Sequence, residues 1–353
     1  MQLDAGATSK VRAAVKGEAG KKRKTKKKVP AIGKKAEKPS VWRSDGTMKE
    51  TRRPAPIYKL TIPVNEDLTE FRQWWMELYG KQIVSMDQRT NVPSVRLADD
   101  VPFEPVSTLQ FFEVKISSEK WPLHVYGFIA TRDSVDYKRN IIFERTRDDC
   151  QIIYQQTPYL SLMGPARAVA LVDPVFFEVH LQVKGTGQSE DYDLISLAQS
   201  FRDTGPLESS LFKSVYTGKI SKLEMTFGHI IMSVEAAVSM KVISGSWPDG
   251  FMGIFAARTA SINDMSVVLL VTGNDGLPLA DDGVIKIQRD VVSAEIMEGE
   301  HLEVFARALG VGGARYDDSI FFKPQERGKL SGTLTIDSCE IEVTVSWYPV
   351  SWW

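Results

Sequence analysis

Cysteine is scarce in this sequence. Cys150 and Cys339 are the only two among 353 residues, and they lie far apart in the chain. The disulfide framework of a secreted domain needs more cysteines, and a zinc ribbon needs closely paired ones. We therefore expect two reduced and largely buried thiols in a protein of a reducing compartment.

Long hydrophobic runs are also missing. The longest apolar runs have five residues, as from Val267 to Val271, whereas a membrane-spanning helix needs roughly 20 such residues. The first forty residues contain no uninterrupted apolar stretch that resembles the core of a signal peptide. We expect a protein of the nucleus or cytoplasm that is not secreted and has no membrane partner.

The motifs of several common catalytic sites do not occur. The sequence has no Gly-x-Ser-x-Gly elbow, and the glycines between Gly310 and Arg315 are more typical of a turn than of a dinucleotide-binding loop. None of the histidines has a partner at metal-ligand spacing, namely His124, His180, His229 and His301. These absences favour a non-enzymatic binding or interaction module with no cofactor and with a protein partner that the sequence does not identify.

Charge is unevenly distributed along the chain. Residues 1–40 hold 13 Lys and Arg against 3 Asp and Glu, whereas the remaining residues hold 31 basic and 42 acidic side chains. Residues 1 to about 55 also contain almost no large apolar side chains, so they cannot bury enough surface to offset the entropy of ordering. We predict a disordered basic tail over residues 1–55 and a mildly acidic body.

The tail contains a run of basic side chains made of Lys21, Lys22, Arg23, Lys24, Lys26, Lys27 and Lys28. Runs of this length are typical of nuclear-import signals and of polyanion contacts, although a solvated tail without function is an equally open interpretation. No aromatic side chains alternate with these residues, so binding to nucleic acid would be electrostatic and sensitive to salt. Because the body is acidic, we expect any nucleic-acid contact through the tail alone.

The apolar periodicity predicts one amphipathic helix over residues 66–79. Its apolar positions recur at three- and four-residue spacing, at Leu68, Phe71, Trp75 and Leu78, with Trp74 beside them. Gly80 is suited to the left-handed conformation that ends many helices. We favour a helix that packs on its own domain over a helix that binds a partner.

From residue 105 onward the period of the sequence changes to two. Apolar side chains alternate with polar ones over residues 177–184, 232–242 and 340–347, and this places Glu178 and Glu235 on solvent-facing sides. Turn-forming clusters separate many of the shorter β-rich segments. We predict a mainly β fold in which residues 105–350 form an antiparallel β-sandwich-like domain. A helical extension and linker would occupy residues 56–104.

Loop carboxylates leave two further hypotheses open. Asp133, Asp136, Asp148 and Asp149 are weak candidates for a calcium site, because loops at one end of a sandwich can pool hard oxygen ligands. Forming turns is the commoner role of such residues. A hydrolase that uses loop carboxylates is an alternative function, and it would require paired carboxyl groups about 5–10 Å apart in a cleft.

Several short segments together resemble a plant family of domains of unknown function that is expanded in the grasses. They are residues 145–151 (RTRDDCQ), 158–165 (PYLSLMGP), 172–179 (VDPVFFEV), 216–219 (YTGK), 228–230 (GHI), 245–250 (GSWPDG) and 282–283 (DG). The resemblance covers about residues 105–350 and implies a mainly β domain without a known activity. A similar domain is fused to a ribosome-inactivating domain in cereal jasmonate-induced proteins, which implies a setting of stress response or defence. The family supplies no catalytic or binding residues.

Overall fold

The fold is known from a computed structural model that describes residues 54–63, 68–90, 103–202 and 208–350. The predicted disordered tail and its basic run at residues 21–28 lie outside these residues. The prediction of a mainly β fold is confirmed, because antiparallel sheets dominate and the described residues contain a single α-helix. No helix among them is long and apolar enough to cross a membrane.

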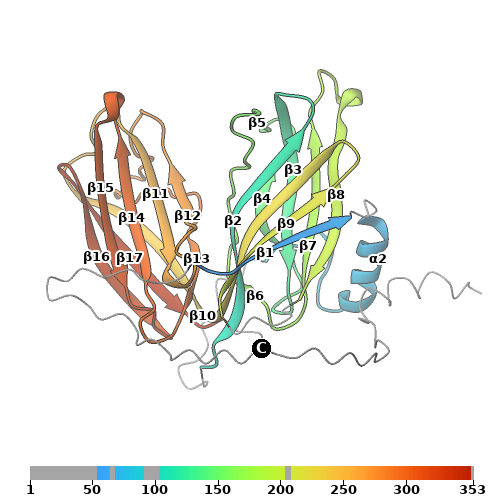
Figure 1. Ribbon diagram of the computed structural model, residues 1–353, viewed down its shortest axis with the longest axis horizontal. Helices are drawn as coiled ribbons and strands as arrows, with labels where there is room; N and C mark the ends of the chain where they lie inside the picture. Colours follow the sequence, from blue (N-terminus) through green and yellow to red (C-terminus); the bar gives the residue numbers. More distant parts are fainter. Residues whose placement is uncertain (1–53, 64–67, 91–102, 203–207, 351–353) are drawn as a thin grey trace, which may run out of the picture. The chain divides into compact units, whose positions relative to one another are not determined.

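One sheet has five strands and lies in the N-terminal half of the described chain (Figure 1). Its strand order is β4 (Asn140–Arg145), β3 (Leu123–Arg132), β7 (Val175–Val183) and β8 (Tyr192–Phe201), with β5 (Gln151–Ile153) also paired to β3. The short 3-10 helix η1 (Gln188–Glu190) lies between β7 and β8.

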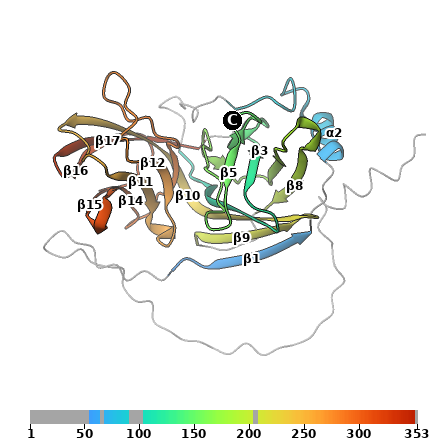
Figure 2. The same cartoon turned by 90° about the horizontal axis from the view of Figure 1, so that it is seen from above.

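The largest sheet has eight strands. Its main path is β1 (Ile57–Pro63), β9 (Ser210–Thr217), β10 (Ser221–Ser244), β17 (Cys339–Tyr348) and β16 (Gly328–Ile336). β2 (Val106–Ser118) and β13 (Val291–Glu295) also pair with β10, and β6 (Val169–Ala170) pairs with β2. Figure 2 shows β1 beside β9 at the edge of this sheet.

The third sheet has four strands in the order β12 (Val267–Val271), β11 (Met252–Thr259), β14 (Leu302–Leu309) and β15 (Arg315–Phe322). Two 3-10 helices, η2 (Ala260–Ile262) and η3 (Val311–Gly313), follow β11 and β14. Alternate side chains of β14 are buried, as expected for a strand with one face in a core.

β10 takes part in two hydrophobic cores. Its first half pairs with β2 and β9 and contributes Phe227 to a core shared with the five-stranded sheet. Its second half pairs with β13 and β17 and contributes Val234 to a core shared with the four-stranded sheet. The register shifts between Ile230 and Ser233, where the two halves meet. The predicted single sandwich-like domain therefore contains two sandwiches joined by one strand of 24 residues.

Four side chains depart from the predicted alternation. Met232 was expected in the core, but it is 44% exposed and has a φ of 45°, because it lies at the irregularity of β10. Glu178, Ser233 and Glu235 were expected in water, but all three are buried. The alternation over residues 341–347 of β17 is confirmed, with Ile341, Val343, Val345 and Trp347 in the core.

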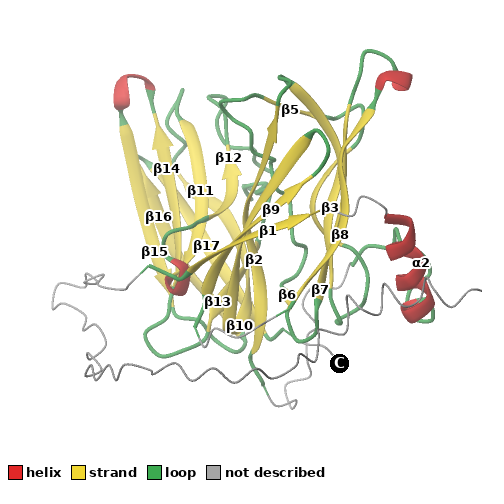
Figure 3. Cartoon of the chain, turned by 45° about the vertical axis from the view of Figure 1, so that its right-hand side comes forward, coloured by secondary structure: helices red, strands yellow, loops and turns green. Residues whose placement is uncertain are grey.

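The predicted helix is α2 (Leu68–Tyr79), and it packs on its own fold as expected (Figure 3). Trp75 is 2% exposed, its ring meets Phe176 of β7 at a centroid distance of 5.2 Å, and its Nε1 donates to the Tyr137 carbonyl at 3.1 Å. Leu78 was expected on the buried face, but it is 50% exposed. The rings of Phe71, Trp74 and Trp75 pack against Phe176 instead.

Residues 57–63 form a strand that the sequence analysis did not predict. β1 pairs with β9 in parallel, and this is the one parallel pair among the named strands of the described chain. The segment expected as a helical extension and linker thus also contributes to the large sheet. The domain boundaries at residues 55 and 104 stay predictions.

Candidate binding site

Glu178 lies at the centre of a buried cluster of arginines. Its side chain is 0% exposed, and it accepts hydrogen bonds from three guanidinium groups. Arg132 Nε and Nη2 donate to Oε2 at 3.0 and 2.9 Å, while Arg139 donates to both oxygens at 3.0 and 2.7 Å. Arg72 of α2 donates to Oε1 at 3.1 Å. The cluster therefore ties the helix to β3, β7 and the loop before β4.

The charge state of Glu178 follows from these contacts. Burial alone would raise its pKa, but the hydrogen bond from Arg139 and the charge of Arg132 outweigh it and hold the pKa below its ordinary value. The carboxylate is thus ionised and fully engaged. It has the character of a structural anchor, not of a proton donor.

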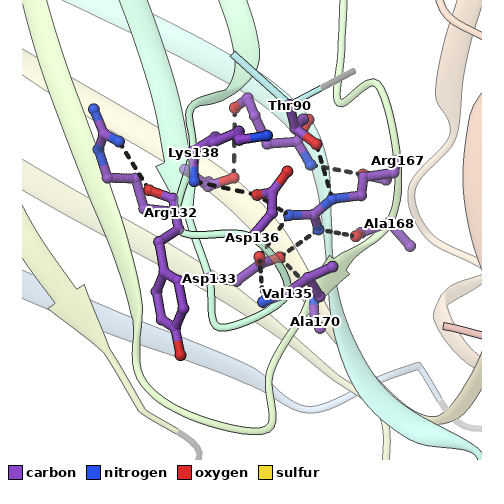
Figure 4. A network of polar contacts seen from close by, with 12 residues as sticks. Thr90, Arg132, Asp133, Val135, Asp136, Lys138, Arg167, Ala168 and Ala170 are labelled. Carbon is purple, nitrogen blue, oxygen red and sulfur yellow. Dashed lines mark hydrogen bonds and ion pairs between the residues drawn. The ribbon is translucent and has the colours of Figure 1, made fainter. Parts of the chain in front are cut away.

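A second buried cluster surrounds Arg167 (Figure 4). Arg167 makes a bidentate pair with Asp133, at 2.7 Å from Nη1 and 2.6 Å from Nη2, and a further bond of 3.0 Å to Asp136. Thr90 Oγ1 accepts from Arg167 Nε, and Asp133 also accepts from the Ala170 backbone N–H. These charge-assisted bonds fix the loop between β3 and β4 against the segment before β6.

The four calcium candidates are therefore not gathered in one place. Asp133 and Asp136 converge on Arg167, whereas Asp148 and Asp149 lie in the loop at the opposite end of β4. Asp149 pairs with Arg145 at 3.0 Å. Within the described part of the chain, no group of three or more His, Cys, Asp or Glu side chains is arranged to hold a metal ion.

The two cysteines are free thiols in different surroundings. Cys339 is buried, and burial raises the pKa of its thiol. Cys150 is half-buried, and its Sγ lies 4.0 Å from Nδ1 of His124.

A cavity of about 680 Å³ lies where two turns meet in the sandwich formed by the five-stranded sheet and the first half of β10. The turn between β2 and β3 contributes residues 117–120, and the turn between β9 and β10 contributes residues 217–222, with Tyr192 from the start of β8. Three lysines and one glutamate line it, namely Lys120, Lys219, Lys222 and Glu119. This volume is within the range of about 300–1,000 Å³ that is usual for small-molecule sites.

The sheet register places polar side chains next to each other in this cavity. Lys222 of β10 lies opposite Ser117 of β2 on one side and opposite Thr217 of β9 on the other. Because neighbours in register point to the same face, the lysine and both hydroxyl groups share one surface. All three side chains are exposed.

Hydrogen bonds hold both turns in place. Trp121 Nε1 donates to the Ser118 carbonyl at 2.9 Å in the first turn. Gly218 N–H donates to the Ser221 carbonyl at 3.0 Å in the second, and Ser221 Oγ donates to the Leu194 carbonyl of β8 at 2.6 Å. The cavity is therefore preformed, which reduces the cost of ordering it around a ligand.

The wall at Tyr192 is fixed by its neighbour Asp191. This carboxylate accepts two bonds from Arg147, at 2.7 and 3.0 Å, and one from the Tyr126 hydroxyl at 2.8 Å. The bonds from Arg147 hold the pKa of Asp191 well below its usual range, while burial and the bond to Asp191 raise the pKa of Tyr126 to about 12. Burial also raises the pKa of Tyr192.

No local pattern in the amino-acid sequence marks this cavity. Its lysines come from turns about a hundred residues apart, and only the pairing of β2 with β10 brings them together. Residues 216–219 carry part of the family resemblance, but no motif there marks a binding site. The basic run that the sequence analysis did single out, at residues 21–28, lies outside the described residues.

The model of one protein family, the domain of unknown function DUF6598, matches residues 108–345. The chain belongs to this family. The DUF6598 match begins within β2 and ends within β17, so β1 and α2 precede it. Both turns of the lysine-lined cavity lie inside it.

Other comparisons add no argument about function. A search of curated proteins gave no significant match. Among solved structures, human GIVD cytosolic phospholipase A2 is 7% identical with a TM-score of 0.23, and the match covers 69% of this chain and 30% of that one. The paired C2 domains of Extended-Synaptotagmin 2 are 8% identical with a TM-score of 0.24, over 74% of this chain and 100% of that one. Scores this low support no inference about fold or ligand.

Proposed function

We propose that this DUF6598 protein is a non-enzymatic binding module whose lysine-lined cavity takes an anionic ligand. The supporting observation is that Lys120, Lys219 and Lys222 line one preformed cavity, together with a single carboxylate, Glu119. The body as a whole is acidic, so this local excess of positive charge is a specific feature and not a general property of the surface.

The alternative of a carboxylate-based hydrolase has less support. Glu178 and Asp133 are bound by buried arginines, and Glu119 is the one carboxylate among the described residues that line the cavity. A general acid and its partner need two carboxyl groups that face one cleft. If the protein turns over a substrate and Glu119→Gln abolishes that activity, the hydrolase would be favoured over the binding module.

The test of the proposal is a thermal-shift and calorimetric titration of the full chain with pyrophosphate. A ligand at about 100 times its Kd stabilises the folded state by about 2.7 kcal/mol, so a clear rise in Tm is expected. The double variant Lys120→Gln/Lys222→Gln should lose this response. The control Lys323→Gln/Lys329→Gln removes two exposed lysines from the region of β15 and β16 and should retain it.

The basic tail needs its own control, because residues 21–28 would also attract pyrophosphate. A variant with its seven basic residues changed to Gln should keep the response that depends on Lys120 and Lys222. A response that disappears with the tail and survives Lys120→Gln/Lys222→Gln would refute the cavity as the site.

For the tail itself, we propose nuclear import as its function, with nucleic-acid contact as the competing one. The supporting observation is the density of basic residues over positions 21–28. A fluorescent fusion of the full chain should accumulate in nuclei, and the neutralised tail variant should not. Unchanged distribution together with salt-sensitive binding of nucleic acid would favour the competing function.

A role in stress or defence is a further part of the proposal. It depends on the resemblance to cereal jasmonate-induced proteins, not on any contact in the fold.

A further inference from the structure

Three positive charges line the cavity. Lys120 comes from the first turn, whereas Lys219 and Lys222 come from the second, where Lys222 is the second residue of β10. Three positive charges from two turns favour a ligand that carries more than one anionic group.

The chain itself shows how it binds planar carboxylates. Asp133 and Asp191 are each held by both arms of an arginine, Arg167 and Arg147, at 2.6–3.0 Å. Arginine matches a carboxylate through its rigid fork, whereas the lysine ammonium acts as a compact point charge with three rotatable donors. A cavity lined by lysines without arginine lacks the fork that this chain uses for carboxylates, and its ammonium groups suit the tetrahedral oxygens of phosphate groups.

Hydroxyl groups form the second chemical feature of the lining. Ser117 and Thr217 flank Lys222 in register, and Ser118 lies on the same turn as Lys120. A hydroxyl group both donates and accepts hydrogen bonds. It therefore complements ligand hydroxyl groups as well as phosphate oxygens.

The lining contains few large apolar side chains. Tyr192 is the one aromatic side chain among the described residues of the cavity wall, and Ile220 is the one large aliphatic side chain. A base-binding site usually stacks its base on aromatic side chains. A single half-buried ring beside an isoleucine is better matched to the C–H face of a saturated ring.

From these features we infer that the ligand of the cavity is a phosphorylated polyol with at least two phosphate groups. This inference rests on the proposed function, because it names the ligand class of the same site. The ligand is either a free sugar or inositol phosphate or the headgroup of a phosphoinositide lipid, since both present the same chemistry to the lysines and hydroxyl groups.

The test compares four soluble probes by calorimetry on the full chain, in about 0.15 M salt to screen the tail. The probes are inositol trisphosphate, pyrophosphate, citrate and ATP. Inositol trisphosphate should bind at least about tenfold more tightly than each of the others, which corresponds to about 1.4 kcal/mol. Lys120→Gln/Lys222→Gln should weaken it by more than about tenfold, while the control Lys323→Gln/Lys329→Gln should not.

A second variant isolates the hydroxyl groups. Ser117→Ala/Thr217→Ala keeps all three lysines, so it should retain pyrophosphate binding and lose the preference for inositol trisphosphate. An unchanged preference would overturn the role of these hydroxyl groups in recognising a polyol. Unchanged Tm values of the unliganded variants would show that each has folded.

The remaining outcomes separate this inference from the proposed function. Equal affinity for citrate and inositol trisphosphate, or tighter binding of ATP, would overturn the polyol phosphate while leaving an anion site. Failure of all four probes would overturn both. The two sources are separated by vesicle binding. Binding to phosphatidylinositol bisphosphate vesicles that requires Lys120 and Lys222, without binding to phosphatidylcholine vesicles, would support a lipid headgroup as the ligand. Binding of soluble inositol trisphosphate without vesicle binding would support a free phosphate.

Discussion

Glu178 is a single residue on which several distant segments depend. Its carboxylate is surrounded by Arg72, Arg132 and Arg139, and two of these arginines are themselves buried. Breaking a buried ion pair leaves an uncompensated charge, which costs far more than the loss of an exposed pair. The cluster therefore stabilises the fold only as a complete set.

We expect Glu178→Gln to lower the free energy of unfolding by about 3–5 kcal/mol, because two buried guanidinium groups lose their counter-charge. Denaturant titration measures this change. Glu144→Gln is the matched control, since Glu144 pairs at 2.7 Å with Arg89, whose side chain is largely exposed. It should cost no more than about 1 kcal/mol. Equal effects of the two substitutions would contradict the account.

The same residue predicts a pH dependence. The pKa of Glu178 is depressed in the folded state below its ordinary value of 4.5. Its contribution to stability is therefore complete above that value and is lost as the pH falls through the folded-state pKa. The difference in unfolding free energy between the wild type and Glu178→Gln should shrink below about pH 4.5. A constant difference down to acid pH would show that ionisation of Glu178 is not involved.

Arg289 presents the opposite case. It is 3% exposed and forms no ion pair with the described residues; its Nη2 donates to the Phe111 carbonyl at 2.7 Å. Burial lowers the pKa of its guanidinium to about 10. We expect Arg289→Met to leave stability unchanged or to raise it by about 1 kcal/mol or more, since a buried charge is removed. The Phe111 carbonyl keeps a bond from Gln110 Nε2. A large loss of stability in denaturant titration would contradict this expectation.

At the scale of elements, Trp75 is the main side chain that packs α2 against the rest of the fold. Trp75 is buried among Phe71, Trp74, Tyr79, Tyr137 and Phe176, whereas Leu78 on the same helix is exposed. Trp75→Ala should cost about 3–5 kcal/mol. Leu78→Ala should change stability by no more than about 0.5 kcal/mol. A comparable loss from Leu78→Ala, measured by thermal unfolding, would show that the helix presents a different face to the fold.

The regular elements were predictable because their signal is local. The period of 3.6 predicted α2 and its end at residue 79, and the period of two predicted β7 and β17. The exceptions depend on contacts between distant segments. The local alternation predicts that Glu178 faces solvent, because its partners Arg72, Arg132 and Arg139 come from distant segments of the chain.

The same reason explains what the sequence did not reveal about the sheet and the cavity. β1 is a strand because β9 pairs with it from about 150 residues away. The cavity exists because β2 and β10 align two turns that carry lysines. Neither arrangement leaves a local pattern in the sequence. The four calcium candidates lie close together in the sequence, but β4 separates Asp133 and Asp136 from Asp148 and Asp149.

At the scale of the whole molecule, β10 should make the two sandwiches unfold together. Residues 52–353 form one compact unit, and β10 contributes to both hydrophobic cores. Phe177→Ala in one core and Phe255→Ala in the other should each shift a single unfolding transition, at a cost of about 3–5 kcal/mol. Calorimetry that shows two transitions, each moved by only one substitution, would contradict this coupling.

The central claim is that the lysine-lined cavity is the ligand site of this DUF6598 protein. The most direct test is an NMR titration of the isotope-labelled full chain with inositol trisphosphate, followed at the backbone amides. The account predicts that the largest shifts cluster at residues 117–120 and 217–222 and vanish in Lys120→Gln/Lys222→Gln. Shifts confined to residues 21–28, or none at either turn, would contradict it.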